Sequence, residues 1–193
     1  YKSVYEAIKT GYRLIDTAEY YKNEKEIGQA IQQAIKEKII KREDLFVTTK
    51  IEPFSKQTNY DKSVENRLKE LNLSYIDLLL VHEPFCADKQ LYKAIERGVT
   101  KGLIRSLGIS NYYTKSAYEN ITKDAKIIPA LIQNENHIYY HDKDFQKYVK
   151  QFGILIESYC PFGGSSNLNK SLNNSVIKKI SEIHNKSPAQ III

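Results

Sequence analysis

The feature that most constrains the fold of this chain is a repeated alternation of short apolar runs and amphipathic stretches. The runs recur about every 30 residues, which is the length of one strand–helix unit. They cover residues 12–17, 45–50, 76–82, 104–110, 130–135 and 154–159. Nearly continuous apolar character, bounded by Gly, Pro or polar residues, is typical of parallel strands covered by helices. The sequence therefore predicts six parallel strands.

The segments between these runs follow the period of a helix face. In 24–38, for example, Ile27, Ile31 and Ile35 recur at four-residue spacing. The predicted helices cover 3–10, 24–38, 63–71, 89–99, 144–152 and 176–184, and Gly11 is a stop signal after the first of them. Alternating strands and helices indicate a closed barrel or an open doubly wound sheet. No Gly-rich turn follows a strand, which disfavours the classical dinucleotide-binding sheet.

Composition excludes several classes of protein. The 193 residues are 41% hydrophobic and 27% charged, which is typical of a folded domain. No run approaches the ~20 apolar residues of a membrane helix, and the chain does not open on a signal peptide. The net charge of +6 comes from scattered lysines and forms no basic stripe, which argues against a nucleic-acid partner. Cys86 and Cys160 have no metal-type spacing, so we expect free thiols and a cytoplasmic location.

Polar side chains gather at the carboxyl ends of the predicted strands. They are Asp16, Lys50, His82, Ser110, Asn111, Gln133, Glu135 and Tyr159. In a parallel barrel these ends face one mouth, where active sites are built. Chance placement of surface residues would rarely put a polar group at the end of all six strands. The pattern therefore predicts one shared site.

Some of these residues have an obvious joint chemistry. Asp16 is a suitable partner for a buried Lys50, and an ammonium beside a tyrosine hydroxyl favours the phenolate and so allows proton transfer near neutral pH. His82 can orient a carbonyl oxygen by a hydrogen bond. Spacing alone leaves open whether Tyr20 or Tyr21 is the tyrosine concerned.

Each residue also has a simpler interpretation. His82 is equally explained as a hydrogen-bonded core histidine, and Lys50 as a strand-end residue that points to water. A metal site at His137 and His141, with Glu135 and Asp142 nearby, is a weaker rival because no clear helix underlies both histidines.

Several segments, in order and correctly spaced, resemble the aldo-keto reductase family. The sequence GYRLIDTAEYYKNE at 11–24 resembles its first signature, and GLIRSLGISN at 102–111 its second. LFVTTK at 45–50 resembles the strand that ends in the catalytic lysine, and YIDLLLVHEP at 75–84 the strand that ends in the catalytic histidine. QNE at 133–135 and SYCPF at 158–162 continue the series, so the resemblance covers essentially the whole chain.

The resemblance implies a (β/α)8 TIM barrel of the α/β class, with six of its eight strands visible in this chain. We expect one domain over 1–193 that lacks the family's first and last strands and is compact, like bacterial and protozoal members. The implied reaction is NADPH-dependent reduction of an aldehyde or ketone. The implied catalytic residues are Asp16, Tyr21, Lys50 and His82, with Tyr21 as the proton donor. The implied cofactor-binding residues are Asp16, Ser110, Asn111, Gln133, Tyr159, Cys160, Phe162 and Gly163.

The chain departs from the family in places. Glu83 stands where many relatives carry Trp, and Cys160 where Ser or Gly is common. The family's residues for the adenosine 2′-phosphate lie in the last strand and the helix after it, so NADP rather than NAD is implied by the resemblance alone. We expect a monomer with a small aldehyde or ketone substrate, and no metal, nucleic-acid or membrane partner. The alternative is a catalytically silent regulatory or structural protein on the same scaffold.

Overall fold

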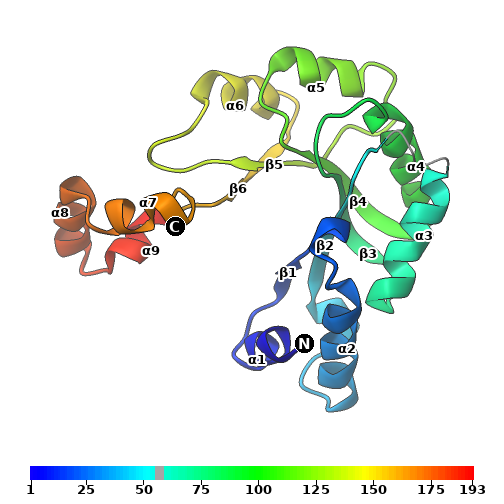
Figure 1. The fold of residues 1–193 in the computed structure, drawn as a ribbon, viewed down its shortest axis with the longest axis horizontal. Coiled ribbons are helices and arrows are strands. Elements are labelled where there is room, and N and C mark those ends of the chain that lie inside the picture. The colour runs from blue at the N-terminus through cyan, green and yellow to red at the C-terminus, as the bar shows by residue number, and fades with distance from the viewer. Residues whose placement is uncertain (55–58) are drawn as a thin grey trace.

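The computed structural model describes residues 1–54 and 59–193. Its centre is one sheet of six parallel strands in the order β1-β2-β3-β4-β5-β6, so each strand pairs with its neighbour in the chain. The sheet curls, and helices α2 to α6 lie along its convex side (Figure 1). This curled half-barrel confirms the expected architecture, with six barrel strands in this chain.

The strands lie where the apolar runs predict them. They are β1 (Leu14–Asp16), β2 (Phe46–Ile51), β3 (Ile76–Val81), β4 (Ile104–Ser110), β5 (Leu131–Glu135) and β6 (Leu155–Tyr159). The first is shorter than the predicted 12–17, because the amide of Tyr12 bonds back to the carbonyl of Ala7 and the Arg13 side chain to that of Ile8. Tyr12 therefore closes the end of α1, while the carbonyl of Arg13 still accepts from the amide of Phe46 in β2 at 2.8 Å.

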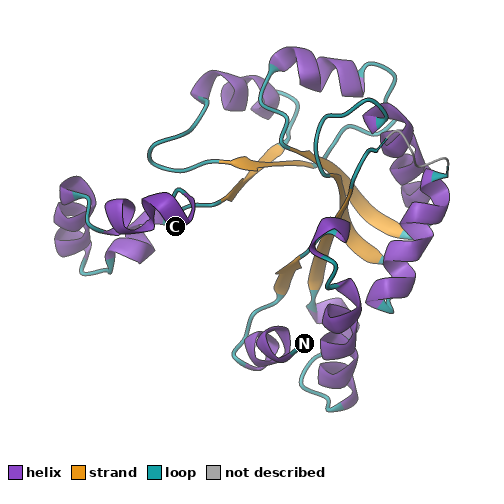
Figure 2. Ribbon diagram, viewed as in Figure 1, coloured by secondary structure: helices purple, strands orange, loops and turns teal. Residues whose placement is uncertain are grey.

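The six predicted helices are all present, and further helices appear. The predicted ones are α1 (Lys2–Lys9), α2 (Glu24–Lys36), α3 (Tyr60–Leu71), α4 (Asp88–Thr100), α6 (Lys143–Lys150) and α8 (Ser175–His184). The pattern missed α5 (Lys115–Thr122), α7 (Gly164–Leu172) and the short 3-10 turns η1 (Glu19–Tyr21) and η2 (Arg42–Asp44), while α9 (Pro188–Ile192) lies at the end of the chain (Figure 2). Among the described residues, no helix combines the length and apolarity that crossing a membrane requires.

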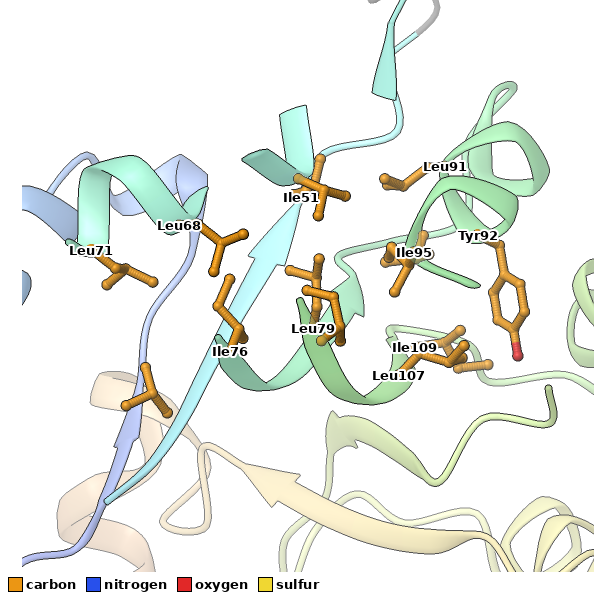
Figure 3. Close-up of a cluster of buried hydrophobic side chains, with 14 of the residues drawn as sticks. Ile51, Leu68, Leu71, Ile76, Leu79, Leu91, Tyr92, Ile95, Leu107 and Ile109 are labelled. Carbon is orange, nitrogen blue, oxygen red and sulfur yellow. The ribbon is translucent and has the colours of Figure 1, made fainter. Parts of the chain in front are cut away.

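The main core fills the space between the sheet and the helices outside it. Ile51, Leu79 and Ile109 from the strands meet Leu91 and Ile95 from α4, and all are fully buried (Figure 3). The side chains of a strand point alternately to opposite faces, so the intervening residues face the inside of the curl.

Strand β3 shows this alternation plainly. Leu79 and Val81 belong to the core cluster against the helices, whereas Leu78 and Leu80 are equally buried and do not. The register pairs Lys50 of β2 with Leu80, which places Lys50 on the inner face as well. The inner face of the curl therefore carries the polar residues of the strand ends.

Candidate active site

A cavity of about 700 Å³ opens at the carboxyl ends of the strands. Its lining residues are Asp16, Tyr20, Tyr21, Glu52, Phe54, His82, Glu83, Ser110, Asn111, Gln133, Glu157, Ser158, Tyr159 and Cys160. Seven of the eight strand-end residues singled out in the sequence lie in this wall or, for Lys50, directly behind Asp16. Because parallel strands end at the same edge of a sheet, residues far apart in the chain meet here.

Lys50 lies beneath the tyrosines and is almost wholly buried, with 1% of its side chain exposed. Its Nζ donates to Asp16 Oδ1 at 2.5 Å and to the carbonyl oxygen of Thr17 at 3.1 Å. These acceptors compensate the burial of the ammonium group, which is costly without a partner. Of the two neighbouring tyrosines, Tyr21 is the one over whose ring the ammonium lies, 5.1 Å from the centroid.

His82 follows the end of β3 and faces both tyrosines. The rings of Tyr20 and Tyr21 meet its imidazole edge-on, with centroids 6.4 and 6.1 Å away. Its Nδ1 touches the carboxylate of Glu52, a residue whose side chain is only 7% exposed. His82 is therefore a histidine in the cavity wall with a carboxylate partner, and not a core histidine bonded to the backbone.

The opposite wall is built from β4, β5 and β6. Ser110 Oγ donates to the Gln133 carbonyl at 2.8 Å, and Gln133 Nε2 donates to Asp16 Oδ2 at 2.8 Å and to Glu157 Oε1 at 2.5 Å. Asn111 Oδ1 accepts from the Tyr159 hydroxyl at 2.7 Å. One network of hydrogen bonds therefore connects this wall to the Asp16–Lys50 pair.

Tyr159 presents a partly buried ring at this wall. Burial, together with a hydrogen bond between its hydroxyl and that of Tyr113, raises the pKa of Tyr159 well above its usual value. The ring therefore stays neutral at physiological pH, and the two hydroxyl contacts, to Tyr113 and Asn111, restrain its orientation.

The loop after β6 carries unusual backbone angles. Cys160 has φ 51° and Gly163 has φ 80°, both in the left-handed region. A Cβ on Gly163 would lie 2.8 Å from the Cβ of Asn167, so glycine is needed there on both counts. Cys160 lines the cavity, whereas Phe162 and Gly163 lead from it to the start of α7.

Glu135 does not join the cavity wall. Its carboxylate lies 3.2 Å from His137 Nε2. Within the part of the chain that the structure describes, no group of three or more His, Cys, Asp or Glu side chains is arranged to hold a metal ion. Both Cys86 and Cys160 are free and exposed.

Sequence reasoning missed two carboxylates of the cavity, Glu52 and Glu157. Both sit two residues from a residue of the predicted strand-end pattern, Glu52 after Lys50 and Glu157 before Tyr159. A spacing of two places side chains on the same face of an extended chain. The two-residue spacing therefore indicated that Glu52 and Glu157 share a strand face with Lys50 and Tyr159. Only the strand register shows that this is the inner face, which lines the cavity.

Comparison with known proteins bears on this architecture. The model of the Aldo/keto reductase family matches residues 1–191. The NAD(P)H-dependent D-xylose reductase I,II of Candida tropicalis is 38% identical over 98% of this chain and 70% of its own length. The NADH-dependent D-xylose reductase of Candida parapsilosis is 34% identical over 98% of this chain and 70% of its own length.

Solved structures give the same answer. The crystal structure of MGS-M4, an aldo-keto reductase from a Medee basin deep-sea metagenome library, superposes with a TM-score of 0.87 at 34% identity, over 100% of this chain and 70% of that one. Bombyx mori aldo-keto reductase in complex with NADP gives 0.88 at 28% identity, over 99% and 67%. The chain belongs to the aldo/keto reductase family, and is an oxidoreductase that acts on carbonyl groups with a nicotinamide cofactor.

Proposed function

We propose that this protein reduces aldehydes and ketones to alcohols with NADPH, and that Tyr21 is the general acid. One arrangement supports the proposal: the ammonium of Lys50 is paired with Asp16 and lies 5.1 Å from the centroid of the Tyr21 ring, and the His82 ring meets that of Tyr21 edge-on at 6.1 Å. A buried positive charge stabilises the phenolate that forms when a tyrosine gives up its proton. Tyr21 is half exposed, so its ring remains accessible to a substrate in the cavity.

The wall made by β4, β5 and β6 suits the nicotinamide end of the cofactor. Both N–H groups of Gln133 go to carboxylates, so its Oε1 is left to accept from a carboxamide, beside the Ser110 hydroxyl and the Asn111 amide. The neutral ring of Tyr159 offers a flat surface for stacking. Cys160, Phe162 and Gly163 form the turn that leads into α7, where backbone N–H groups suit a phosphate.

The bound cofactor supplies the hydride, which forms the new C–H bond at the carbonyl carbon. The carbonyl π electrons move to the oxygen, and Tyr21 gives its hydroxyl proton to that oxygen. Lys50, neutralised by Asp16 in the resting protein, stabilises the phenolate left behind. His82 lies beside the tyrosine and orients the carbonyl by a hydrogen bond.

The test compares Tyr21→Phe with Tyr20→Phe in the full-length protein. Both rings meet His82 edge-on, so Tyr20→Phe is a matched control for the loss of one hydroxyl. We expect Tyr21→Phe to lower kcat/KM for a reactive aromatic aldehyde at least about 100-fold, and Tyr20→Phe to stay within a few fold. The substrates tested include aldoses such as D-xylose, because the relatives of this chain include D-xylose reductases. Each substrate is assayed with NADPH and with NADH.

The possible results separate the alternatives. Equal losses in the two variants would contradict the assignment of Tyr21. Cofactor binding without turnover of any carbonyl would instead favour the silent scaffold. A higher kcat/KM with NADH would contradict the choice of NADPH and leave the reaction unchanged.

A further inference from the structure

We propose that Glu52 is a positioning residue for His82: its carboxylate keeps the imidazole doubly protonated, so that His82 offers a cationic N–H donor to the substrate oxygen. The inference rests on the proposed carbonyl reduction in this cavity. It adds a residue outside the expected catalytic set of Asp16, Tyr21, Lys50 and His82.

The register of the sheet explains why the two side chains meet. Lys50 pairs with Leu80 and Ile51 with Val81, and the amide of His82 then donates to the carbonyl of Ile51 at 3.0 Å. Glu52 and His82 are the next residues of the two strands. Because Ile51 and Val81 face the outer core, the residues that follow them face the cavity.

The contact between the two side chains fixes one proton. His82 Nδ1 is buried and touches Glu52 Oε1, and it has no other polar partner among the described residues. An ionised carboxylate can only accept hydrogen bonds, so Nδ1 has to carry a hydrogen. A neutral imidazole with its hydrogen on Nδ1 has a lone pair on Nε2, which repels a carbonyl oxygen. Donation from Nε2 therefore requires the second proton and a positive charge.

The surrounding charges favour that cation. The ionisable groups near the pair are Tyr20, Tyr21 and Glu19 from η1, Lys50 from β2, Asp16 from β1 and Glu83 beside His82. Lys50 is neutralised by Asp16, and Glu19 lies 3.5 Å from Arg67. No Lys or Arg is among the described residues that line the cavity. The remaining charges of the cavity wall, on Glu52, Glu83 and Glu157, are negative.

The burial of Glu52 favours its pairing with His82. Its side chain is 7% exposed, and an isolated buried carboxylate is costly, so the two groups stabilise each other's charge. A cationic donor also forms a hydrogen bond roughly twice as strong as a neutral one, and the gain is largest when the carbonyl oxygen becomes negative in the transition state.

The first experiment needs neither cofactor nor substrate. Nitrogen-15 NMR of histidine-labelled protein distinguishes protonated from unprotonated ring nitrogens, and the His82 signals are those that vanish in His82→Gln. At pH 7.5 we expect both nitrogens of His82 to be protonated, because Nδ1 donates to the Glu52 carboxylate and Nε2 is the donor to the substrate. A neutral ring with its hydrogen on Nε2 would overturn the proposal.

The second experiment compares the pH dependence of kcat/KM in Glu52→Gln and Glu83→Gln. An amide at position 52 can turn and donate to Nδ1, so a neutral His82 then carries its hydrogen on Nε2. We expect Glu52→Gln to lower kcat/KM about tenfold near neutral pH and to remove the decline that accompanies deprotonation of His82. Glu83→Gln removes a carboxylate that lines the cavity but does not contact Nδ1, so it should change the pH profile less than Glu52→Gln and leave the decline in place.

Failure of the inference is distinguishable from failure of the proposed function. If Glu52→Gln folds, as judged by its thermal unfolding, and keeps a profile parallel to the wild type, Glu52 has no role through His82. If the wild-type protein reduces no carbonyl, the proposed function fails, while NMR of the wild type still decides where the protons of His82 lie.

Discussion

Replacing Lys50 with Met separates the contribution of its charge to chemistry from its contribution to stability. The Nζ lies 2.5 Å from Asp16 Oδ1, a separation worth about 7 kcal/mol of attraction at an effective dielectric constant of 20. Desolvation of both groups offsets most of this. Asp16 is also 30% exposed and keeps its bond from Gln133, so it is not left alone in the variant. We expect Lys50→Met to lower the free energy of unfolding by about 1–3 kcal/mol, less than for a fully buried pair.

The effect on the reaction is larger. With the ring-centroid distance of 5.1 Å as the separation, an ammonium stabilises a forming phenolate by about 3 kcal/mol at the same dielectric constant. That corresponds to about a 100-fold loss of kcat. Cofactor affinity should change little, because Lys50 lies behind the cavity wall.

The assays are urea unfolding followed by circular dichroism, cofactor titration by fluorescence, and steady-state kinetics. The double variant Lys50→Met with Asp16→Asn is the stability control: without the carboxylate it should recover most of the lost stability and none of the activity. A Lys50→Met protein with kcat within threefold of the wild type would refute the reasoning, since the lysine would then only neutralise Asp16.

Two further predictions concern the scaffold. A Cβ at Gly28 would lie 2.4 Å from the carbonyl oxygen of Leu71, so Gly28→Ala should force α2 and α3 apart. We expect it to lower the free energy of unfolding by about 1–3 kcal/mol, measured by thermal denaturation. Ala30→Gly, which leaves this contact unchanged, is the control. Burial raises the pKa of Glu24 despite its bonds to Thr49 and Arg67, so the wild type should lose stability relative to Glu24→Gln as the pH rises through that raised value; a constant difference between pH 4 and 8 would contradict the shift.

Much of the fold is predictable from the sequence because buried parallel strands leave a strong pattern. The bounds of β3 and β4 differ from the predicted runs by one residue at most. Helix α7 is different: its sequence, GSSNLNKSL, is rich in residues of low helix propensity, and it forms at the turn made by Gly163 and Gly164. Helix α5 has a capping threonine, Thr114, whose Oγ1 accepts from the amide of Ala117, a local signal that was available.

The site, too, contains residues that the sequence predicts and residues that it does not. Residues at strand ends, such as Asp16 and His82, are predictable because topology alone brings them to one edge. Spacing does not distinguish Tyr20 from Tyr21, since both lie in one 3-10 turn whose orientation depends on its packing against β2. Glu52 escapes sequence analysis for a related reason: its partner, His82, lies 30 positions away and becomes its neighbour only through the pairing of β2 with β3.

The alternation of inner and outer residues in β2 and β3 has a consequence for how this protein tolerates change. Alternate residues of each strand face opposite sides of the sheet, so Ile51 and Val81 face the core and Lys50 faces the cavity side. An insertion or deletion of one residue within a strand would exchange the two sets, turning isoleucine toward the cavity and lysine toward the helices. Such a change would disrupt the packing of the core and the active site at the same time. We therefore expect this chain to tolerate insertions and deletions only in the loops beyond the strand ends, where residues no longer alternate between the two faces of the sheet.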